Sequence, residues 1–369
     1  MANTIKIFLF SLLSLLITLA VLETGLRVCA PQDCIQPMMA QMDPEIIYTL
    51  TPNHSACLKG TSTRMYRLTT NRLGLRDRDI PTNKPPNTFR IMLLGDSLSM
   101  GEGVQLEETY IEQLETMLKG QSPLPIETIN AAIRGYGTDQ ELILFQRLGR
   151  KFHPDLVILA FYLGNDIDDN WEGGLFKLEK GVLTQQTPNA RTSLKFKYFS
   201  IQSRLQNTLG YSFLMAHSHL ANWLRLRYAR LVYHSVFKGT KKAFENTPQD
   251  NQPRFQLTMA ILDEWNTAVR QAGAQPFMLI VPRRQELELL RASQPGNQLK
   301  LDREVEKYCR NARIPFLNLT DVLRQLPGDL ESLYLEHGSG YFNPRGHAVI
   351  AQALVNVLRA NALLPSSTR

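Results

Sequence analysis

Five short runs of nearly continuous hydrophobic residues lie between residues 87 and 320. They cover Phe89–Gly95, Ile126–Ala131, Asp155–Phe161, Pro276–Pro282 and Ile314–Leu319. Apolar runs of this length, without alternating polar positions, are typical of parallel strands that are covered on both faces. The pattern therefore predicts five buried parallel strands.

Segments with helical periodicity separate these strands. They read ETYIEQLETMLKG, TDQELILFQRLGRKF, LTMAILDEWNTAVRQAG and LDREVEKYCRNA. A last helix is expected from Pro344, with Asn343 as its N-cap. Strands that alternate with helices predict an α/β fold with three layers, built on a doubly wound parallel sheet. In such a fold the functional site lies beyond the carboxyl ends of the strands.

The first hydrophobic run of the chain is longer than the predicted strands and lies near the N-terminus. Lys6 precedes Ile7–Leu22, which contains no charged residue. About 20 residues span a bilayer, with a lower limit near 17. The best small-residue cleavage site ends at Ala30 and is followed by a proline, which hinders processing. We predict an uncleaved signal-anchor over residues 1–28, with a single pass through the cell membrane and the rest of the chain outside the cytoplasm. A signal peptide and a buried core helix are the alternatives.

Two segments interrupt the alternation of strands and helices. Residues 29–86 are rich in Pro, Asn, Thr and Met, and we expect a linker and a segment that packs on the main domain, 87–363. Residues 170–255 are expected to form an insertion, with turns and a hairpin first and a basic, aromatic helical part over 199–244. That helical part is compatible with a membrane-surface face. The favoured interpretation is a lid or cap helix that packs its aromatic residues on the domain and leaves its Arg and Lys in solvent.

Composition narrows the possible partners. The 369 residues are 43% hydrophobic and 20% charged, with a net charge of +7, which is ordinary for a globular protein. We see no zinc-finger spacing, RNP-like box or helix-turn-helix signature, so we expect no nucleic-acid partner. The four cysteines have no metal-ligand spacing, and we expect neither a metal nor a cofactor. The sequence is compatible with a Cys34–Cys57 disulfide and equally with free thiols.

Polar residues suited to acyl transfer follow the first three predicted strands. The first strand runs directly into Gly95-Asp96-Ser97-Leu98, the second is followed by a loop containing Gly135, and the third by Asn165. A serine hydroxyl becomes a nucleophile when a neighbouring base takes its proton. A glycine N–H and an asparagine amide are donors that stabilise the oxyanion of such a reaction. A serine that merely caps a helix is the structural alternative.

The motifs GDSLSMGEGV, NAAIRGYGTDQ and FYLGND resemble the first three sequence blocks of the GDSL/SGNH hydrolases, in order and spacing. The segments YRLTTNRLGLRD and FNPRGHAVIAQAL are similar to the membrane-anchored bacterial members of that family. The resemblance covers roughly residues 65–360. It implies a flavodoxin-like sheet, Ser97 as the nucleophile, and oxyanion donors from the N–H groups of Ser97 and Gly135 and from the amide of Asn165.

The last block departs from the family pattern. Family members carry an Asp and a His just before the final helix, and alignment on FNPRGH places Ser339 and Tyr341 at these two positions. A phenol with a pKa near 10 is a poor base at neutral pH. His337, four residues before Tyr341, is the predicted substitute base. His347, inside the final helix, is the alternative, although packing is the commoner role there. In the third possibility the base is absent.

The resulting hypothesis is a serine esterase or O-acyltransferase that acts on acyl esters. An envelope or exported polysaccharide is the expected carrier, since family relatives anchored in this way often modify glycans. The alternative is a degenerate domain that binds a glycan or a protein partner, because a serine site without its base loses roughly 10⁴-fold in rate. Among other polar residues, Asp166, Asp168 and Asp169 are expected in a solvated loop. The pair Arg283-Arg284 is expected at the same sheet edge, on an anionic substrate or in solvent.

Overall fold

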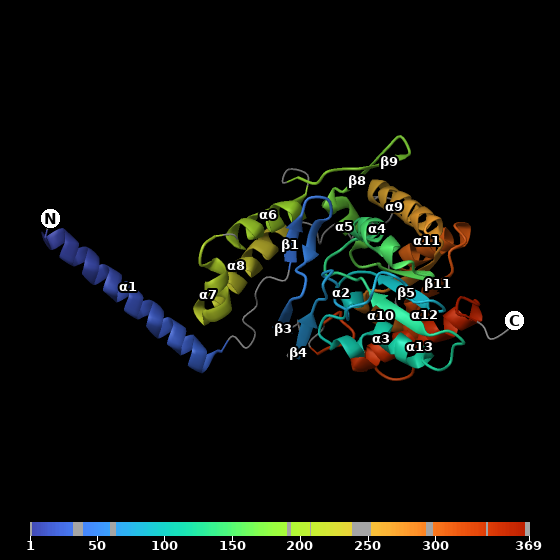
Figure 1. The fold of residues 1–369 in the computed structure, drawn as a ribbon, viewed down its shortest axis with the longest axis horizontal. Helices are drawn as coiled ribbons and strands as arrows, with labels where there is room; N and C mark the ends of the chain where they lie inside the picture. The colour runs from blue at the N-terminus through green and yellow to red at the C-terminus, as the bar shows by residue number, and fades with distance from the viewer. Residues whose placement is uncertain are drawn as a thin grey trace.

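A five-stranded parallel sheet forms the centre of the computed structural model (Figure 1), with the strand order β11-β10-β7-β5-β6. The structure describes residues 2–31, 40–59, 64–189, 193–206, 208–237, 252–292, 298–336 and 339–365. The strands are β5 (Phe89–Leu94), β6 (Ile126–Asn130), β7 (Leu156–Tyr162), β10 (Gln275–Val281) and β11 (Phe316–Asn318). In chain order this arrangement is 2-1-3-4-5, the flavodoxin-like order. The predicted fold class and its five strands are confirmed.

Helices cover both faces of the sheet. One face carries α4 (Thr138–Arg147), α9 (Gln252–Gln271) and α11 (Gln298–Asn311). The other carries α3 (Tyr110–Leu118), α10 (Arg284–Arg291), α12 (Leu319–Gln325) and α13 (Pro344–Ala360). Met92 and Leu94 of β5 pack on the first group, whereas Ile91 and Leu93 pack on the second. Successive strand residues point to opposite faces, so an uninterrupted apolar strand serves both layers.

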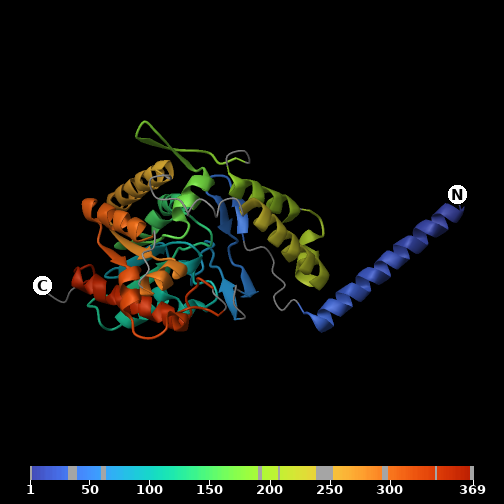
Figure 2. The ribbon, with the colours of Figure 1, turned by 180° about the vertical axis from the view of Figure 1, so that it is seen from behind.

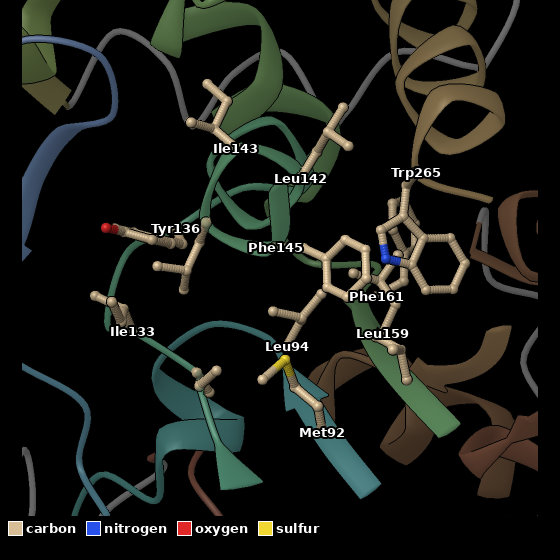
Figure 3. Packing of buried hydrophobic residues seen from close by; sticks show 14 of the residues in the cluster. Met92, Leu94, Ile133, Tyr136, Leu142, Ile143, Phe145, Leu159, Phe161 and Trp265 are labelled. Atoms are coloured by element: carbon tan, nitrogen blue, oxygen red, sulfur yellow. The ribbon is translucent and has the colours of Figure 1, made fainter. Parts of the chain in front are cut away.

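Large aromatic side chains fill the core under the first group of helices (Figure 3). Phe145 of α4, Phe161 of β7 and Trp265 of α9 are fully buried. They gather above Met92 and Leu94 of β5. Burial of a side chain of this kind stabilises the fold by roughly 1.5–3 kcal/mol. The central strands that lead to the site are therefore packed in a large apolar core.

Two hairpins precede the sheet in the chain, and the first of them packs against the segment that follows β6. They consist of β1 (Ala40–Asp43) with β2 (Ile47–Leu50), and β3 (Ser55–Lys59) with β4 (Met65–Thr69). The Tyr48 hydroxyl donates a hydrogen bond to the Arg134 carbonyl at 2.5 Å, and the Tyr136 hydroxyl donates to the Tyr48 carbonyl at 2.6 Å. Gln140 donates to the Ile46 carbonyl at 2.8 Å. These contacts fix the loop that contains Gly135.

A hairpin and three helices lie between β7 and α9. After α5 (Asp166–Gly173) come β8 (Phe176–Glu179) and β9 (Val182–Gln185), then α6 (Leu194–Gln206), α7 (Tyr211–His217) and α8 (His219–Phe237). The predicted hairpin and helical part are both present, and residues 238–251 lie outside the described residues. Short helices complete the fold: α2 (Ser97–Met100), η1 (Leu106–Glu108), η2 (Gly149–Phe152) and η4 (Leu330–Leu333).

The N-terminal helix α1 (Ala2–Cys29) extends away from the rest of the molecule in both views (Figures 1 and 2). Its apolar side chains are exposed, and Asn3–Cys29 is long and apolar enough to cross a membrane. A helix of 28 residues is roughly 42 Å long, which exceeds the thickness of a bilayer core. The alternative of a buried core helix is wrong.

Candidate active site

Ser97 lies at the carboxyl end of β5, where the chain turns into the short helix α2. Asp96 caps this helix by accepting a hydrogen bond from the Leu98 N–H at 2.9 Å. Burial raises the pKa of Asp96 to about 7, and the charges of Asp169 and Glu102 add to the rise. A side chain at Gly95 would place its Cβ 2.6 Å from the Ser99 Cβ, so only glycine fits at this turn. The predicted strand-end position of Ser97 is therefore observed.

A buried arginine from the N-terminal hairpin region holds the loop after α2. The Arg76 side chain is fully buried, and one of its nitrogens donates to the carbonyls of Met100 at 2.8 Å and Gly101 at 2.5 Å. Another nitrogen donates to the Val104 carbonyl at 2.6 Å. Charged donors make strong hydrogen bonds to carbonyls. This role was not predicted from the sequence, although Arg76 belongs to the YRLTTNRLGLRD segment that carries the family resemblance.

The Ser97 hydroxyl hydrogen-bonds the phenol of Tyr341, with 3.3 Å between the two oxygens. Burial raises the pKa of Tyr341 well above its ordinary value, and the nearby Glu102 carboxylate raises it further. The phenol is therefore protonated at neutral pH and does not act as a base. Tyr341 thus lies beside Ser97, as expected of a residue at the position where the family pattern has its histidine.

His347 lies in the core, where its contacts are those of a packing residue. It is 1% exposed, and its Nδ1 accepts a hydrogen bond from the Tyr110 N–H at 3.2 Å. Its ring stacks on the Tyr110 ring with 5.6 Å between centroids. Burial lowers the pKa of His347 to about 3, and the charge of Arg76 lowers it further. His347 therefore has a packing role. His337, the predicted substitute base, lies outside the described residues.

The turn before α13 sets the position of Tyr341. The Ser339 hydroxyl accepts a hydrogen bond from the Tyr341 N–H at 3.1 Å, and the Ser339 carbonyl accepts one from Arg284 at 3.0 Å. Arg284 also pairs with Glu288 at 2.8 Å and with Glu331. The arginine expected on a substrate or in solvent is instead a structural brace of this turn.

Gly135 is the first of the residues predicted to donate to an oxyanion, and that role stays a prediction. Its φ of +76° is left-handed, and a Cβ here would lie 2.8 Å from the Tyr48 hydroxyl. Its carbonyl accepts a hydrogen bond from Lys195 at 2.9 Å. The Ile133 N–H donates to the Gly95 carbonyl at 2.9 Å, so this loop runs beside the turn that carries Ser97. Within the described part of the chain, the N–H groups of Ser97 and Gly135 make no hydrogen bond.

Asn165 is the other predicted donor, and it follows β7, the neighbour of β5 in the sheet. Its side-chain nitrogen donates to the Asp169 carboxylate at 2.8 Å. A primary amide has two N–H groups, so this bond leaves one of them for another acceptor. The role of Asn165 as an oxyanion donor stays a prediction.

The acidic residues after Asn165 are not solvated, and that expectation is wrong. Asp166 is buried and accepts a hydrogen bond from the Tyr162 N–H at 2.9 Å. Asp168 pairs with Arg254 at 2.6 Å, and Asp169 pairs with Lys195 at 2.7 Å. Both cations come from distant segments of the chain. No group of three His, Cys, Asp or Glu is arranged to hold a metal ion within the described ranges.

A buried carboxylate next to Tyr341 was not anticipated from the sequence. Glu102 is 3% exposed and lies between Gly101 and Gly103, both of which have left-handed backbones. One of its oxygens is 3.4 Å from the Nε of Arg134, whose side chain is 62% exposed. The site therefore has a buried negative group and a positive group at its rim. The GEG triplet directly after the serine motif is the sequence signal for this carboxylate.

Cys29, Cys57 and Cys309 form no disulfide with one another or with any other described residue. Cys34 lies outside the described residues, so the Cys34–Cys57 pair stays untested.

Comparison with known proteins gives structural relatives only. No protein-family profile matches the sequence, and no curated protein shows significant similarity to it. A lipase/acylhydrolase from Enterococcus faecalis is 13% identical, with a TM-score of 0.41, over 76% of this chain and 100% of that one. A psychrotrophic esterase from Pseudoalteromonas sp. is 13% identical, with a TM-score of 0.41, over 75% and 99%.

A member of the lipolytic protein G-D-S-L family from Veillonella parvula is 9% identical, with a TM-score of 0.40, over 73% of this chain and 98% of that one. At these identities the likeness concerns the fold alone. The resemblance to the GDSL/SGNH hydrolases rests on the sequence motifs and on the flavodoxin-like strand order of the sheet.

Proposed function

We propose that the chain is a membrane-anchored SGNH-type domain that binds an acyl ester at Ser97 and hydrolyses it very slowly. The contact of 3.3 Å between Ser97 and Tyr341 carries this proposal. It puts a protonated phenol where hydrolysis requires a proton acceptor.

The site offers hydrogen-bond donors for an ester but no observed base beside Ser97 in the described structure. Attack by a serine hydroxyl needs a base, and a triad without its base loses roughly 10⁴-fold in rate. The unoccupied N–H groups of Ser97 and Gly135 are suited to hold an ester carbonyl oxygen. We therefore expect the site to bind an ester, although it lacks, within the described residues, a base that takes the proton of Ser97.

The proposed ligand is an acyl ester on an envelope or exported polysaccharide. The apolar helix α1 supports a location at a membrane. The orientation with the domain outside the cytoplasm is part of the proposal. The exposed guanidinium of Arg134 puts a positive charge at the rim of the site, which favours an ester carried by an anionic polymer.

A second candidate is a working esterase or O-acyltransferase with Ser97 as nucleophile and His337 as base. Asn165 and Gly135 would then stabilise the oxyanion. The observation in its favour is that the N–H groups of Ser97 and Gly135 have no partner in the described structure, as an oxyanion hole requires.

One assay separates the two candidates. Full-length wild type, Ser97→Ala and His337→Ala are compared in detergent for hydrolysis of p-nitrophenyl acetate, with His217→Ala as a control at an exposed histidine. The proposal expects all four rates to agree within about two-fold, since no serine–base pair operates. A loss of about 10²-fold or more in both Ser97→Ala and His337→Ala, but not in the control, overturns it and establishes the second candidate.

A further inference from the structure

The last turns of α1 are bonded to the junction between α7 and α8. The Glu23 carboxylate accepts hydrogen bonds from the Ser218 hydroxyl at 2.8 Å, the His219 N–H at 3.0 Å and the Leu220 N–H at 2.9 Å. These backbone donors belong to the start of α8, where N–H groups lack partners within their own helix. Glu23 therefore caps α8 from another helix, and its negative charge complements the helix dipole.

An arginine one turn further along α1 binds the other side of the same junction. Arg27 donates to the His217 carbonyl, at the end of α7, at 2.7 Å, and it pairs with Glu23 at 2.7 Å. A cation at the carboxyl end of one helix and an anion at the amino end of the next are both stabilising. Because Glu23 directly follows the apolar run Ile7–Leu22, this junction lies where the proposed anchor leaves the bilayer.

Helices α7 and α8, which meet at this junction, and the preceding helix α6 expose apolar side chains, which we call the insertion face. Its members are Ile201, Leu205, Phe213, Leu214, Leu224 and Tyr228, of which Phe213 is 66% and Tyr228 is 65% exposed. The opposite side of α6 is packed on the domain, since Phe199 stacks on Tyr48 with 3.9 Å between ring centroids. The cap role therefore accounts for one side of α6 and leaves the insertion face uncovered.

The same helices carry positive charge only. Residues 194–237 contain six Lys and Arg and no Asp or Glu, although the whole chain has 34 acidic residues. Arg204 and Arg227 are exposed, and the Arg227 guanidinium lies 5.3 Å from the centroid of the Trp223 ring. Exposed aliphatic and aromatic residues beside arginines are typical of segments that lie in a membrane interface. Each basic residue near an anionic surface adds to the attraction.

We propose that the insertion face lies on the surface of a bilayer rich in anionic lipid, beside the point where α1 emerges. Both views place α6, α7 and α8 between α1 and the sheet (Figures 1 and 2). This arrangement rests on the anchor role of α1 in the proposed function. It holds the domain at a fixed height and orientation over the membrane, instead of on a free tether.

The test measures how close single residues lie to lipid in the full-length chain. Cys29, Cys34 and Cys57 are replaced by serine, and the buried Cys309 is kept. An environment-sensitive fluorophore is then attached at Leu224→Cys or Tyr228→Cys, and the protein is placed in nanodiscs containing nitroxide-labelled lipid. Val182→Cys on β9, 64% exposed, is the matched apolar control, and Leu13→Cys in α1 reports the anchor.

With phosphatidylglycerol present, we expect fluorescence to be lost at residues 13, 224 and 228 and to be kept at residue 182. Arg204→Gln with Arg227→Gln is expected to reduce the loss at residue 228. The proposal is overturned if residue 13 is quenched but residues 224 and 228 keep their fluorescence, as residue 182 does. In that case the anchor role of α1 still holds. Fluorescence retained at residue 13 contradicts the anchor itself.

Discussion

The two sides of the candidate site differ in what forms them, namely backbone on one side and side chains on the other. The nucleophile side consists of backbone at the ends of β5 and β6, set by Gly95 and Gly135 and held by the buried guanidinium of Arg76. The base side consists of two side chains in one turn before α13, namely Ser339 and Tyr341. Backbone geometry follows from the fold, whereas a base is a property of a single side chain. Two substitutions are therefore enough to change the chemistry of the base side without disturbing the other.

The block FNPRGH fixes the start of α13, directly after the turn that forms the base side. Asn343 caps α13 by accepting from the Gly346 N–H at 3.0 Å and donates to the carbonyls of Ser332 and Tyr334, both at 3.0 Å. His347 packs on Tyr110. These residues fix the start of the last helix, so the block keeps a structural role whether or not a proton is transferred beside it.

The largest expected effect comes from restoring the family residues on the base side. In the double variant Ser339→Asp with Tyr341→His, an imidazole replaces the phenol beside Ser97 and a carboxylate is added to orient it. We expect p-nitrophenyl acetate hydrolysis to increase by about 10³-fold, since general base catalysis contributes 10²–10⁴-fold. Initial rates at neutral pH measure the gain.

Two controls sharpen this result. The same double variant with Ser97→Ala should lose the gain, and Tyr341→His alone should gain less, because nothing orients its imidazole. A double variant that folds with an unchanged melting temperature and shows no gain would mean that the nucleophile side is itself incomplete.

The next largest effect is expected on the nucleophile side. Arg76→Met removes the donor to the carbonyls of Met100, Gly101 and Val104 and leaves them buried without a partner. We expect a loss of about 3 kcal/mol in the free energy of unfolding, since hydrogen bonds to charged groups contribute roughly 1.5–3 kcal/mol each. Denaturant unfolding measures it.

Arg72→Met is the matched control, because Arg72 is half exposed and pairs with Asp79 across 3.7 Å. A surface pair of this kind contributes less than about 1 kcal/mol. Equal losses in the two variants would refute the role given to Arg76.

The sequence was sufficient for the sheet and for the contact between Ser97 and Tyr341. Continuous apolar strands predict parallel pairing, and alignment on FNPRGH predicts which residue faces the serine. It was not sufficient for groups whose partners come from far along the chain. Asp169 is neutralised by Lys195 of the insertion, and nothing in the local pattern of either residue shows that they meet. The solvated acidic loop was therefore the wrong expectation.

A smaller effect separates His347 from a catalytic histidine. His347→Phe keeps an aromatic ring beside Tyr110 but removes Nδ1, which in the wild type accepts a hydrogen bond from the Tyr110 N–H at 3.2 Å. We expect a loss of about 2 kcal/mol in stability, the cost of an unsatisfied buried donor, and no change in ester hydrolysis per folded molecule. Thermal unfolding and the same assay measure both. A lower hydrolysis rate at an unchanged melting temperature would indicate that His347 takes part in the reaction.

The smallest effect concerns the charges behind the nucleophile side. Glu141 of α4 is fully buried, neither of its carboxylate oxygens has a hydrogen-bond partner in the described structure, and its pKa is raised well above the ordinary value by burial and by Asp96. The native state therefore keeps a proton that the unfolded chain releases above about pH 4.3, so stability falls as pH rises. Glu141→Gln does not titrate, so we expect its melting temperature to exceed that of wild type at pH 8, with the advantage vanishing near pH 4. An equal advantage at both pH values would assign the effect to packing instead of to the proton.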